Sequence, residues 1–351
     1  MPTESLVERF ARRDPAALAR AISLVENQSD GFERLLAHAY ASVARGAARR
    51  IGITGPPGAG KSTLTEQLIQ AFRAQGLRVG VVAVDPTSPF TGGALLGDRI
   101  RMEAASLDTG VFIRSMATRG THGGLATTTE EVADLLEAFG FDRILIETVG
   151  VGQTELDIAG TADTTMLVLV PESGDAIQTL KAGVMEIADV YVINKSDRPG
   201  ADKLRQEVEV MLGIRRGNAF RHVGPHHHPP TPRRSGGQAG KAPDGVESSA
   251  WEPPVLPTVA VRGEGIVDLI SALERHAEHL AASGGLALRR RERVRRRLRA
   301  VTERAVRQWI WDATRADELL AERVDDVAEG RRNPYDVAAE VVEQVKIGAM
   351  R

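Results

Sequence analysis

The sequence contains no cysteine. That absence excludes disulfide bonds, cysteine-ligated zinc, iron–sulfur clusters and thiol nucleophiles. There is also no run of about 18 apolar residues of the kind that crosses a bilayer, and the polar residues 1–13 lack the apolar core of a secretory signal. The 45 basic and 47 acidic residues nearly cancel, giving a net charge of −2, so no charge excess indicates nucleic acid or an anionic membrane as a partner. We therefore expect a cytoplasmic protein that binds neither.

The apolar pattern divides the 351 residues into three segments. Residues 1–48 carry apolar side chains at spacings of three and four, which predicts an N-terminal helical extension. Residues 49–284 alternate short β-branched runs with amphipathic helices, a pattern typical of an α/β domain with a mostly parallel sheet. Within it, residues 215–250 are rich in Pro, Gly, Ser and His and are expected to form a disordered insertion. Residues 285–351 are expected to form a C-terminal helical arm.

Seven strands are predicted, at Arg50–Thr54, Arg78–Val84, Val111–Arg114, Arg143–Thr148, Thr164–Val170, Val190–Asn194 and Val255–Val261. Helices are predicted between them at 61–75, 124–139, 176–188, 201–212 and 265–282. In the arm, the pattern predicts one helical region from 286 to about Glu329 and a last helix at Tyr335–Lys346.

A phosphate-binding loop is predicted directly after the first of these strands. The residues GPPGAGKST match GxxxxGK(S/T) and precede an amphipathic helix, as this motif requires. Its backbone N–H groups and the helix N-terminus bind phosphates, the lysine reaches the β- and γ-phosphates, and the serine hydroxyl ligates Mg²⁺. The predicted nucleotide-binding residues here are Gly55, Gly58, Ala59, Gly60, Lys61, Ser62 and Thr63.

The residues NKSD after the strand Val190–Asn194 indicate guanine as the base. The Asp197 carboxylate can accept hydrogen bonds from both N1–H and the N2 amine of guanine, whereas adenine offers no such pair of donors. The Lys195 stem would cover the ring, and Asn194 would either bond the purine edge or tie this loop to the phosphate loop. The P-loop upstream makes this short match specific, so we predict a P-loop GTPase.

Carboxylates at strand ends are the predicted magnesium ligands, together with Ser62. Glu147 begins an ETVG element that resembles D-x-x-G, and the Gly150 N–H would sense the γ-phosphate. Asp85 ends a second strand and Asp98 follows in a Gly-rich stretch; the alternative for both is a carboxylate that caps a loop. Where small GTPases carry a glutamine after this glycine, the chain has Val151, so slow intrinsic hydrolysis is expected.

Three long segments resemble the MeaB/ArgK group of GTPases: DPTSPFTGGALLGDRIRM (85–102), ETVGVGQTE (147–155) and PESGDAIQTLKAGVMEIADVYVINKSD (171–197). The resemblance extends over nearly the whole chain and omits only 215–250. It implies a homodimeric GTPase that uses GTP, GDP and Mg²⁺ and acts as a chaperone for cobalamin-dependent acyl-CoA mutases, chiefly methylmalonyl-CoA mutase. Such a protein gates adenosylcobalamin loading and protects the mutase, with an adenosyltransferase as a further partner, and is expected to bind no cobalamin stably itself.

The resemblance also assigns roles to residues. It places three switch segments at 85–102, 147–155 and 172–183, the third of which meets the mutase through Asp175, Gln178 and Lys181. Lys181 would supply catalytic charge beside Lys61, Asp85 and Glu147, or is instead a solvated helix residue. The family carries Ser-Ala in the base loop where this chain has Val259-Ala260, so the Ala260 N–H is expected to bond guanine O6 while Asp197 loses a serine hydroxyl.

Several other features suggest different functions. His222 and the run His226-His227-His228 would suit a nickel or cobalt chaperone, but a low-complexity linker is the simpler interpretation without cysteine. The label carried by the ArgK branch leaves a transport-linked kinase as an alternative. Eight arginines between 289 and 299 would suit nucleic acid. We favour a dimerisation helix instead, because apolar residues form one seam along it, at Val294, Leu298, Val301, Ala305 and Trp309.

Overall fold

The computed structural model describes residues 3–43, 48–85, 107–117, 124–148, 154–173, 182–215 and 250–349. The chain divides into two compact units, residues 1–290 and 291–351. Within the described ranges, no helix is both long enough and apolar enough to cross a membrane.

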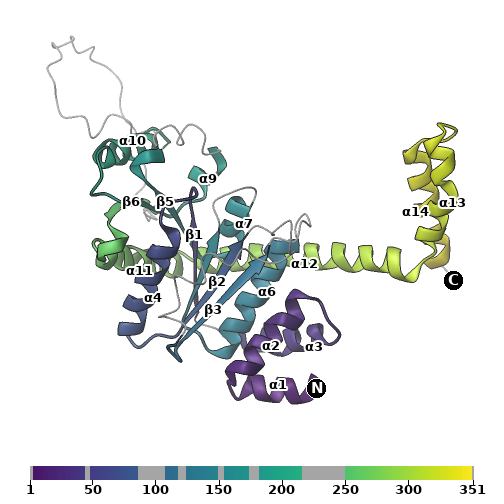
Figure 1. Ribbon diagram of the computed structural model, residues 1–351, viewed down its shortest axis with the longest axis horizontal. Coiled ribbons are helices and arrows are strands. Elements are labelled where there is room, and N and C mark those ends of the chain that lie inside the picture. The colour runs from purple at the N-terminus through teal and green to yellow at the C-terminus, as the bar shows by residue number, and fades with distance from the viewer. Residues whose placement is uncertain are drawn as a thin grey trace, which may run out of the picture. The chain divides into compact units, whose positions relative to one another are not determined.

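A seven-stranded parallel sheet organises the first unit (Figure 1). Its strand order is β3-β2-β4-β1-β5-β6-β7, and every neighbouring pair runs parallel. The strands are β1 (Arg49–Thr54), β2 (Val79–Asp85), β3 (Val111–Ala117), β4 (Arg143–Thr148), β5 (Thr164–Leu169), β6 (Val190–Asn194) and β7 (Val255–Thr258). The central strands are buried along nearly their whole length, which explains their unbroken β-branched and leucine runs. The predicted α/β fold is confirmed.

Helices cover both faces of the sheet. Along β4, Leu145 packs with one layer while Ile144 and Ile146 pack with the other, because successive side chains of a strand point to opposite faces. One layer contains α4 (Lys61–Ala74) and α11 (Ile266–Ala282). The opposite layer contains α6 (Gly124–Phe139), α7 (Thr154–Thr161), α9 (Ala182–Glu186) and α10 (Ala201–Arg215).

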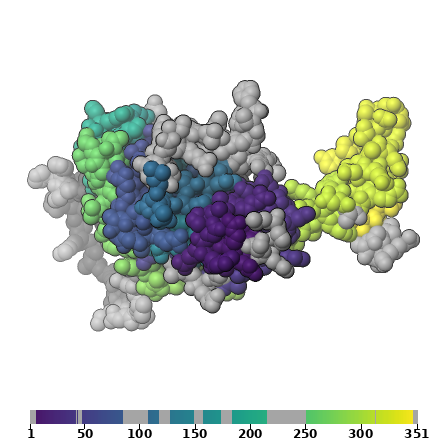
Figure 2. Space-filling view, turned by 60° about the horizontal axis from the view of Figure 1, so that its bottom comes forward, coloured from purple at the N-terminus to yellow at the C-terminus, as the bar shows by residue number. Residues whose placement is uncertain are grey.

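Three N-terminal helices extend the layer that contains α6. They are α1 (Thr3–Ala11), α2 (Pro15–Glu26) and α3 (Phe32–Val43). Leu18, Ile22 and Leu35 are fully buried in the same apolar cluster as Phe139 of α6, and the ring of Phe10 meets that of Phe139 edge to face at 5.5 Å. In Figure 2 these helices, in purple, lie directly against the blue and teal part of the domain. Their apolar stripe is thus continuous with the core of the sheet domain.

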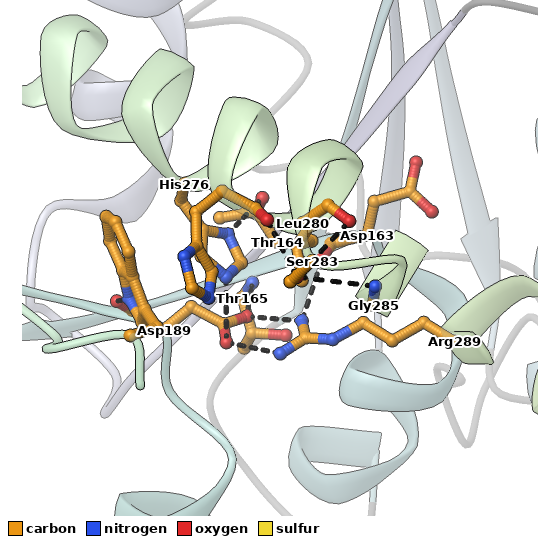
Figure 3. A network of polar contacts seen from close by, with 11 residues as sticks. Asp163, Thr164, Thr165, Asp189, His276, Leu280, Ser283, Gly285 and Arg289 are labelled. Carbon is orange, nitrogen blue, oxygen red and sulfur yellow. Dashed lines mark hydrogen bonds and ion pairs between the residues drawn. The ribbon is translucent and has the colours of Figure 1, made fainter. Parts of the chain in front are cut away.

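A polar network lies at the N-terminal ends of β5 and β6 (Figure 3). Asp189 accepts hydrogen bonds from the Thr165 N–H at 2.8 Å and from both terminal nitrogens of Arg289, at 2.7 and 2.8 Å. The fully buried His276 of α11 lies between Asp189, 3.3 Å from its Nε2, and the Thr164 hydroxyl, 2.8 Å from its Nδ1. The start of α12 (Gly285–Ala313) is thereby fixed to the sheet.

The second unit consists of the rest of α12 with α13 (Ala316–Ala328) and α14 (Pro334–Ala349). Within it, α13 and α14 pack against each other, with Val337 and Val341 buried. Glu340 of α14 accepts from Arg323 of α13 at 3.1 Å and from Arg332 in the turn at 2.5 Å.

Some predicted element boundaries were wrong. The last strand ends at Thr258 rather than Val261, because the Val259 N–H turns back to the Glu264 carbonyl and a 3-10 turn occupies Ala260–Arg262. The helical region predicted from 286 to about Glu329 consists of two helices, α12 and α13, and the Thr314 hydroxyl accepts from the Ala316 N–H between them. The helix α7 was not predicted. Residues 176–181 and most of 215–250 lie outside the described residues, so the predictions made there stay predictions.

Candidate nucleotide-binding site

The loop between β1 and α4 has the backbone of a phosphate-binding loop. Gly55 has φ of 141°, and a Cβ there would lie 2.1 Å from the Val168 carbonyl oxygen of β5, so only glycine fits. Gly60, with φ of 85°, begins α4 without any side-chain cap, and a Cβ there would lie 2.4 Å from the Asn194 amide. The first N–H groups of α4 thus have no side-chain acceptor at the cap, which is the arrangement that binds anions.

The Lys61 side chain folds back over this loop. Its Nζ donates to the Gly55 carbonyl at 2.9 Å and to the Pro56 carbonyl at 3.0 Å, and the residue is only 6% exposed. A lysine held at the mouth of such a loop can follow phosphate oxygens with small changes of its terminal torsions, since an ammonium group donates in any direction. Gly58 and Ala59 complete the loop, and the half-buried Ser62 and Thr63 follow Lys61 in the first turn of α4.

Glu147, at the end of β4, lies beside this turn. Its Oε1 accepts from the Ser62 hydroxyl at 2.7 Å and its Oε2 accepts from the Thr65 hydroxyl at 2.8 Å. The carboxylate is 4% exposed. Strand pairing places it there, because Glu147 is the register partner of Ile53 in β1, just before the loop.

The Ser62 and Glu147 oxygens fit a magnesium ion. Mg²⁺ prefers oxygen ligands in an octahedron with bonds of about 2.1 Å, so neighbouring ligands lie about 2.9 Å apart. The 2.7 Å between Ser62 Oγ and Glu147 Oε1 is close to that separation. Of the other proposed ligands, Asp85 ends β2 with its side chain outside the described part, and Asp98 lies outside the described residues altogether, as does Gly150. Among the described residues, no group of three or more His, Asp or Glu side chains could hold a metal ion.

Asn194 connects the predicted base loop to the phosphate loop. Its Nδ2 donates to the Ala59 carbonyl at 2.8 Å, and its Oδ1 accepts from the Thr258 hydroxyl at 3.2 Å and from the Ala260 N–H at 3.1 Å. Of the two roles that the sequence left open for Asn194, the structure therefore shows the tie between loops. The residue is 2% exposed, so removing its amide would leave three partners unsatisfied in the interior.

The carboxylate of Asp197 is paired with Arg262, which sequence reasoning missed. Arg262 Nη1 lies 3.1 Å from Asp197 Oδ2, and its Nε lies 2.6 Å from Glu264 Oε1. The pKa of Arg262 is raised, first by the hydrogen bond to Glu264 and further by Asp197. Lys195 adopts φ of 56°, a left-handed conformation that turns the chain between Asn194 and Asp197. The third-switch residues Asp175, Gln178 and Lys181 lie outside the described residues.

Comparison with known proteins agrees with this geometry. Residues 18–315 match the model of the family described as "Methylmalonyl Co-A mutase-associated GTPase MeaB". The chain belongs to the MeaB family of GTPases. Its predicted resemblance to the MeaB/ArgK group is thereby confirmed, and its enzymatic class is that of a GTP hydrolase with a P-loop fold.

Relatives of this MeaB-family chain match it over most or nearly all of its length. A putative GTPase of Pyrococcus abyssi is 42% identical over 347 residues, which cover 99% of this chain and 98% of the relative. The mouse mitochondrial methylmalonic aciduria type A homolog is 37% identical over 290 residues, or 78% of this chain and 63% of the relative. A crystal structure of a LAO/AO transport system kinase aligns with a TM-score of 0.64 at 26% identity, covering 98% of this chain and 97% of that one.

Proposed function

We propose that this GTPase is a chaperone for a cobalamin-dependent acyl-CoA mutase, chiefly methylmalonyl-CoA mutase, and that it gates adenosylcobalamin loading and protects the mutase. The observation that carries the proposal is the family match over residues 18–315, whose description names association with methylmalonyl-CoA mutase. The likeness to the mouse methylmalonic aciduria type A homolog supports the same partner. An adenosyltransferase, as the source of the cofactor, is a further proposed partner.

The proposed nucleotide cofactors are GTP and GDP with Mg²⁺. Ser62 and Glu147 would hold the ion, which would neutralise charge on the β- and γ-phosphate oxygens, and Asp85 and Asp98 are proposed as further ligands. The loop glycines, Lys61 and the first turn of α4 would bind the phosphates. Asp197 and Lys195 would bind the guanine, and Asn194 would hold the loops around it. The Ala260 N–H donates to Asn194 Oδ1 at 3.1 Å, so it would have to exchange that acceptor for guanine O6 in order to bind the base.

Hydrolysis is proposed to be slow until the mutase binds. The residue after Gly150 is Val151, which cannot orient a water molecule. Lys181, in the proposed partner-binding segment with Asp175 and Gln178, would then supply positive charge to the transition state. The GTPase would act as a timer, because its rate of GTP hydrolysis would depend on whether the mutase is bound.

The test is GTP turnover by the purified protein, alone and with methylmalonyl-, isobutyryl- or ethylmalonyl-CoA mutase. We expect one of these mutases to accelerate turnover at least roughly tenfold, and Lys181→Ala to reduce the accelerated rate. Lys203→Ala is the matched control, since Lys203 lies on α10 with 81% of its side chain exposed. A turnover rate that is the same with and without every mutase would refute the chaperone proposal. Transfer of the γ-phosphate to a transport protein would support a kinase instead.

We also propose that the chain is a homodimer joined through the arm. On α12, the apolar seam is exposed: Val294 by 38%, Leu298 by 65%, Val301 by 37% and Trp309 by 41%. Such a stripe on one face of a long helix is typical of a packing surface. We propose that residues 285–351 form this dimerisation arm. It would be separate from the GTPase domain 49–284 and from the N-terminal extension 1–48.

A further inference from the structure

The position of Glu147 depends on two hydroxyl groups of one helix. Ser62 stands in the first turn of α4 and Thr65 at the start of the second, and each donates to a different oxygen of the Glu147 carboxylate, at 2.7 and 2.8 Å. Ser62 is half-buried, whereas Thr65 is fully buried. Ser62 therefore can reach a bound ion, while the Thr65 hydroxyl contacts two protein oxygens, the Lys61 carbonyl and Glu147 Oε2.

The Thr65 hydroxyl has two acceptors and one proton. Besides Glu147 Oε2, its Oγ1 lies 3.0 Å from the Lys61 carbonyl, four residues earlier in the helix. Hydrogen bonds to a carboxylate are shorter and roughly twice as strong as those between neutral groups. The proton is therefore directed mainly to Glu147, and the bond crosses from α4 to the end of β4.

A second hydrogen bond to the carboxylate matters more for a glutamate at this position than for an aspartate. Glutamate has one more methylene and one more rotatable bond, so a carboxylate held by Ser62 alone could pivot about that contact. With both oxygens held, the carboxylate has one orientation, and its Oε1 stays beside Ser62 Oγ at the separation that neighbouring magnesium ligands need. Glu147 in the ETVG element and Thr65, one turn into α4, thus depend on each other for this geometry.

We propose that Thr65 is a positioning residue for magnesium binding, acting through Glu147. It touches neither nucleotide nor metal; it fixes the carboxylate that does. The proposal rests on the proposed use of Mg²⁺ with guanine nucleotide. Groups that orient a metal-binding carboxylate in this way commonly change metal affinity by roughly 10- to 100-fold when they are removed.

The test measures binding of a fluorescent GDP analogue while Mg²⁺ is titrated, and again in EDTA. Thr65→Val keeps the shape of the side chain and removes its hydroxyl. We expect the Mg²⁺ concentration for half-maximal effect to rise roughly tenfold, with affinity in EDTA unchanged within about twofold. Thr65→Ser, which keeps the hydroxyl, should restore the wild-type titration.

Thr161 offers a matched control. It is 2% exposed, and its hydroxyl donates to the Asp157 carbonyl four residues earlier in α7, at 3.2 Å. Thr161→Val therefore removes the same kind of helix bond without a carboxylate, and should leave the Mg²⁺ titration unchanged. A double-mutant cycle with Glu147→Gln completes the design, because Thr65→Val should add nothing once the carboxylate is gone.

Three results would overturn the inference: a Thr65→Val titration that matches wild type, an equal loss of affinity in EDTA, or a full Thr65→Val effect in the Glu147→Gln background. Should Thr65→Val not fold, as judged by circular dichroism, Thr65→Ala is read by the same criteria. If the wild-type protein itself shows no Mg²⁺ dependence, the proposed cofactor fails. If that dependence is present and Thr65→Val leaves it unaltered, only this inference fails.

Discussion

At the scale of single residues, Asp197, the carboxylate proposed to bind the base, is held differently from what the sequence suggested. The resemblance in sequence predicts a serine at the position of Val259, and the lack of its hydroxyl was expected to loosen the Asp197 carboxylate. In the structure Arg262, itself fastened by Glu264, pairs with Asp197 at 3.1 Å. A guanidinium three residues further along the same loop thus takes over the orienting contact.

Asp197→Asn is expected to exchange guanine for xanthine as the preferred base. The amide offers one donor and one acceptor, which match the C2 carbonyl and N1–H of xanthine, whereas guanine needs two acceptors. Losing charged hydrogen bonds should weaken GTP binding roughly 10- to 100-fold. Displacement of a bound fluorescent nucleotide by GTP and by XTP measures both affinities. Unchanged preference for GTP in the variant would mean that Asp197 does not contact the base.

Arg262→Ala should have a smaller effect in the same assay. The Arg262 and Asp197 side chains are 50% and 37% exposed, and water screens exposed ion pairs strongly, so GTP affinity should fall by less than roughly fivefold. Added salt should shrink the difference between variant and wild type. Arg205→Ala is the matched control, because Arg205 makes a similar exposed pair with Glu209 on α10. An effect equal to that of Asp197→Asn would instead make Arg262 a direct base contact.

At the scale of elements, the network at the start of β5 and β6 fixes α11 and α12 to the sheet. Burial alone would raise the pKa of Asp189. The hydrogen bonds and charge of Arg289, together with the nearby His276, outweigh burial and lower the pKa to about 2. The group thus stabilises the fold in its ionised form.

The stability that Asp189 contributes should depend on pH in a defined window. A carboxyl whose folded pKa of about 2 lies below its ordinary value of 3.8 stabilises fully above about pH 4 and loses that effect as pH falls towards 2. The shift corresponds to on the order of 2 kcal/mol. Urea unfolding of the wild type and Asp189→Asn, from pH 7 down to pH 2.5, measures it. The difference between their free energies of unfolding should become smaller as the pH falls. A gap that stays constant would contradict this role.

The same scale shows what sequence patterns can and cannot predict. Periodicity placed β4, α6 and β6 almost to the residue, since these elements bury regular apolar faces. Arg50, at the start of a strand, gave no sign that it would be buried to 2% exposure and paired with Asp134 and Glu137 of α6, at 2.6 and 2.7 Å. Such pairs join positions more than 80 residues apart, and no local pattern encodes them.

The residues of the candidate site also divide into those that the sequence predicts and those that it does not. The phosphate loop, Asn194 and Asp197 are contiguous motifs and can be found from sequence. Thr65, Thr258 and Arg262 are ordinary residues whose role appears only when strand pairing brings Glu147, Asn194 and Asp197 beside them. Spacing offered one signal in advance: Thr65 lies one helical turn after Lys61, on the same side of α4.

At the scale of the whole molecule, the homodimer that we propose would form through the exposed seam of α12. Leucine, valine and tryptophan side chains exposed by 37% to 65% along one face would be costly to leave in water, and burying them against a second copy removes that cost. The seam runs along a helix that also carries many arginines, so charged side chains flank the apolar face.

Leu298→Glu is expected to convert a dimer into monomers. A carboxylate in the middle of the seam would lose its hydration on association, at a cost of several kcal/mol, which is enough to dissociate a dimer at micromolar concentration. Light scattering should give twice the 37.8 kDa chain mass for wild type and the single mass for the variant. Val306→Glu is the matched control, because Val306 is 47% exposed on the same helix but about 100° around it from the centre of the seam. Dimers that survive Leu298→Glu but not Val306→Glu would place the interface on a different face of α12.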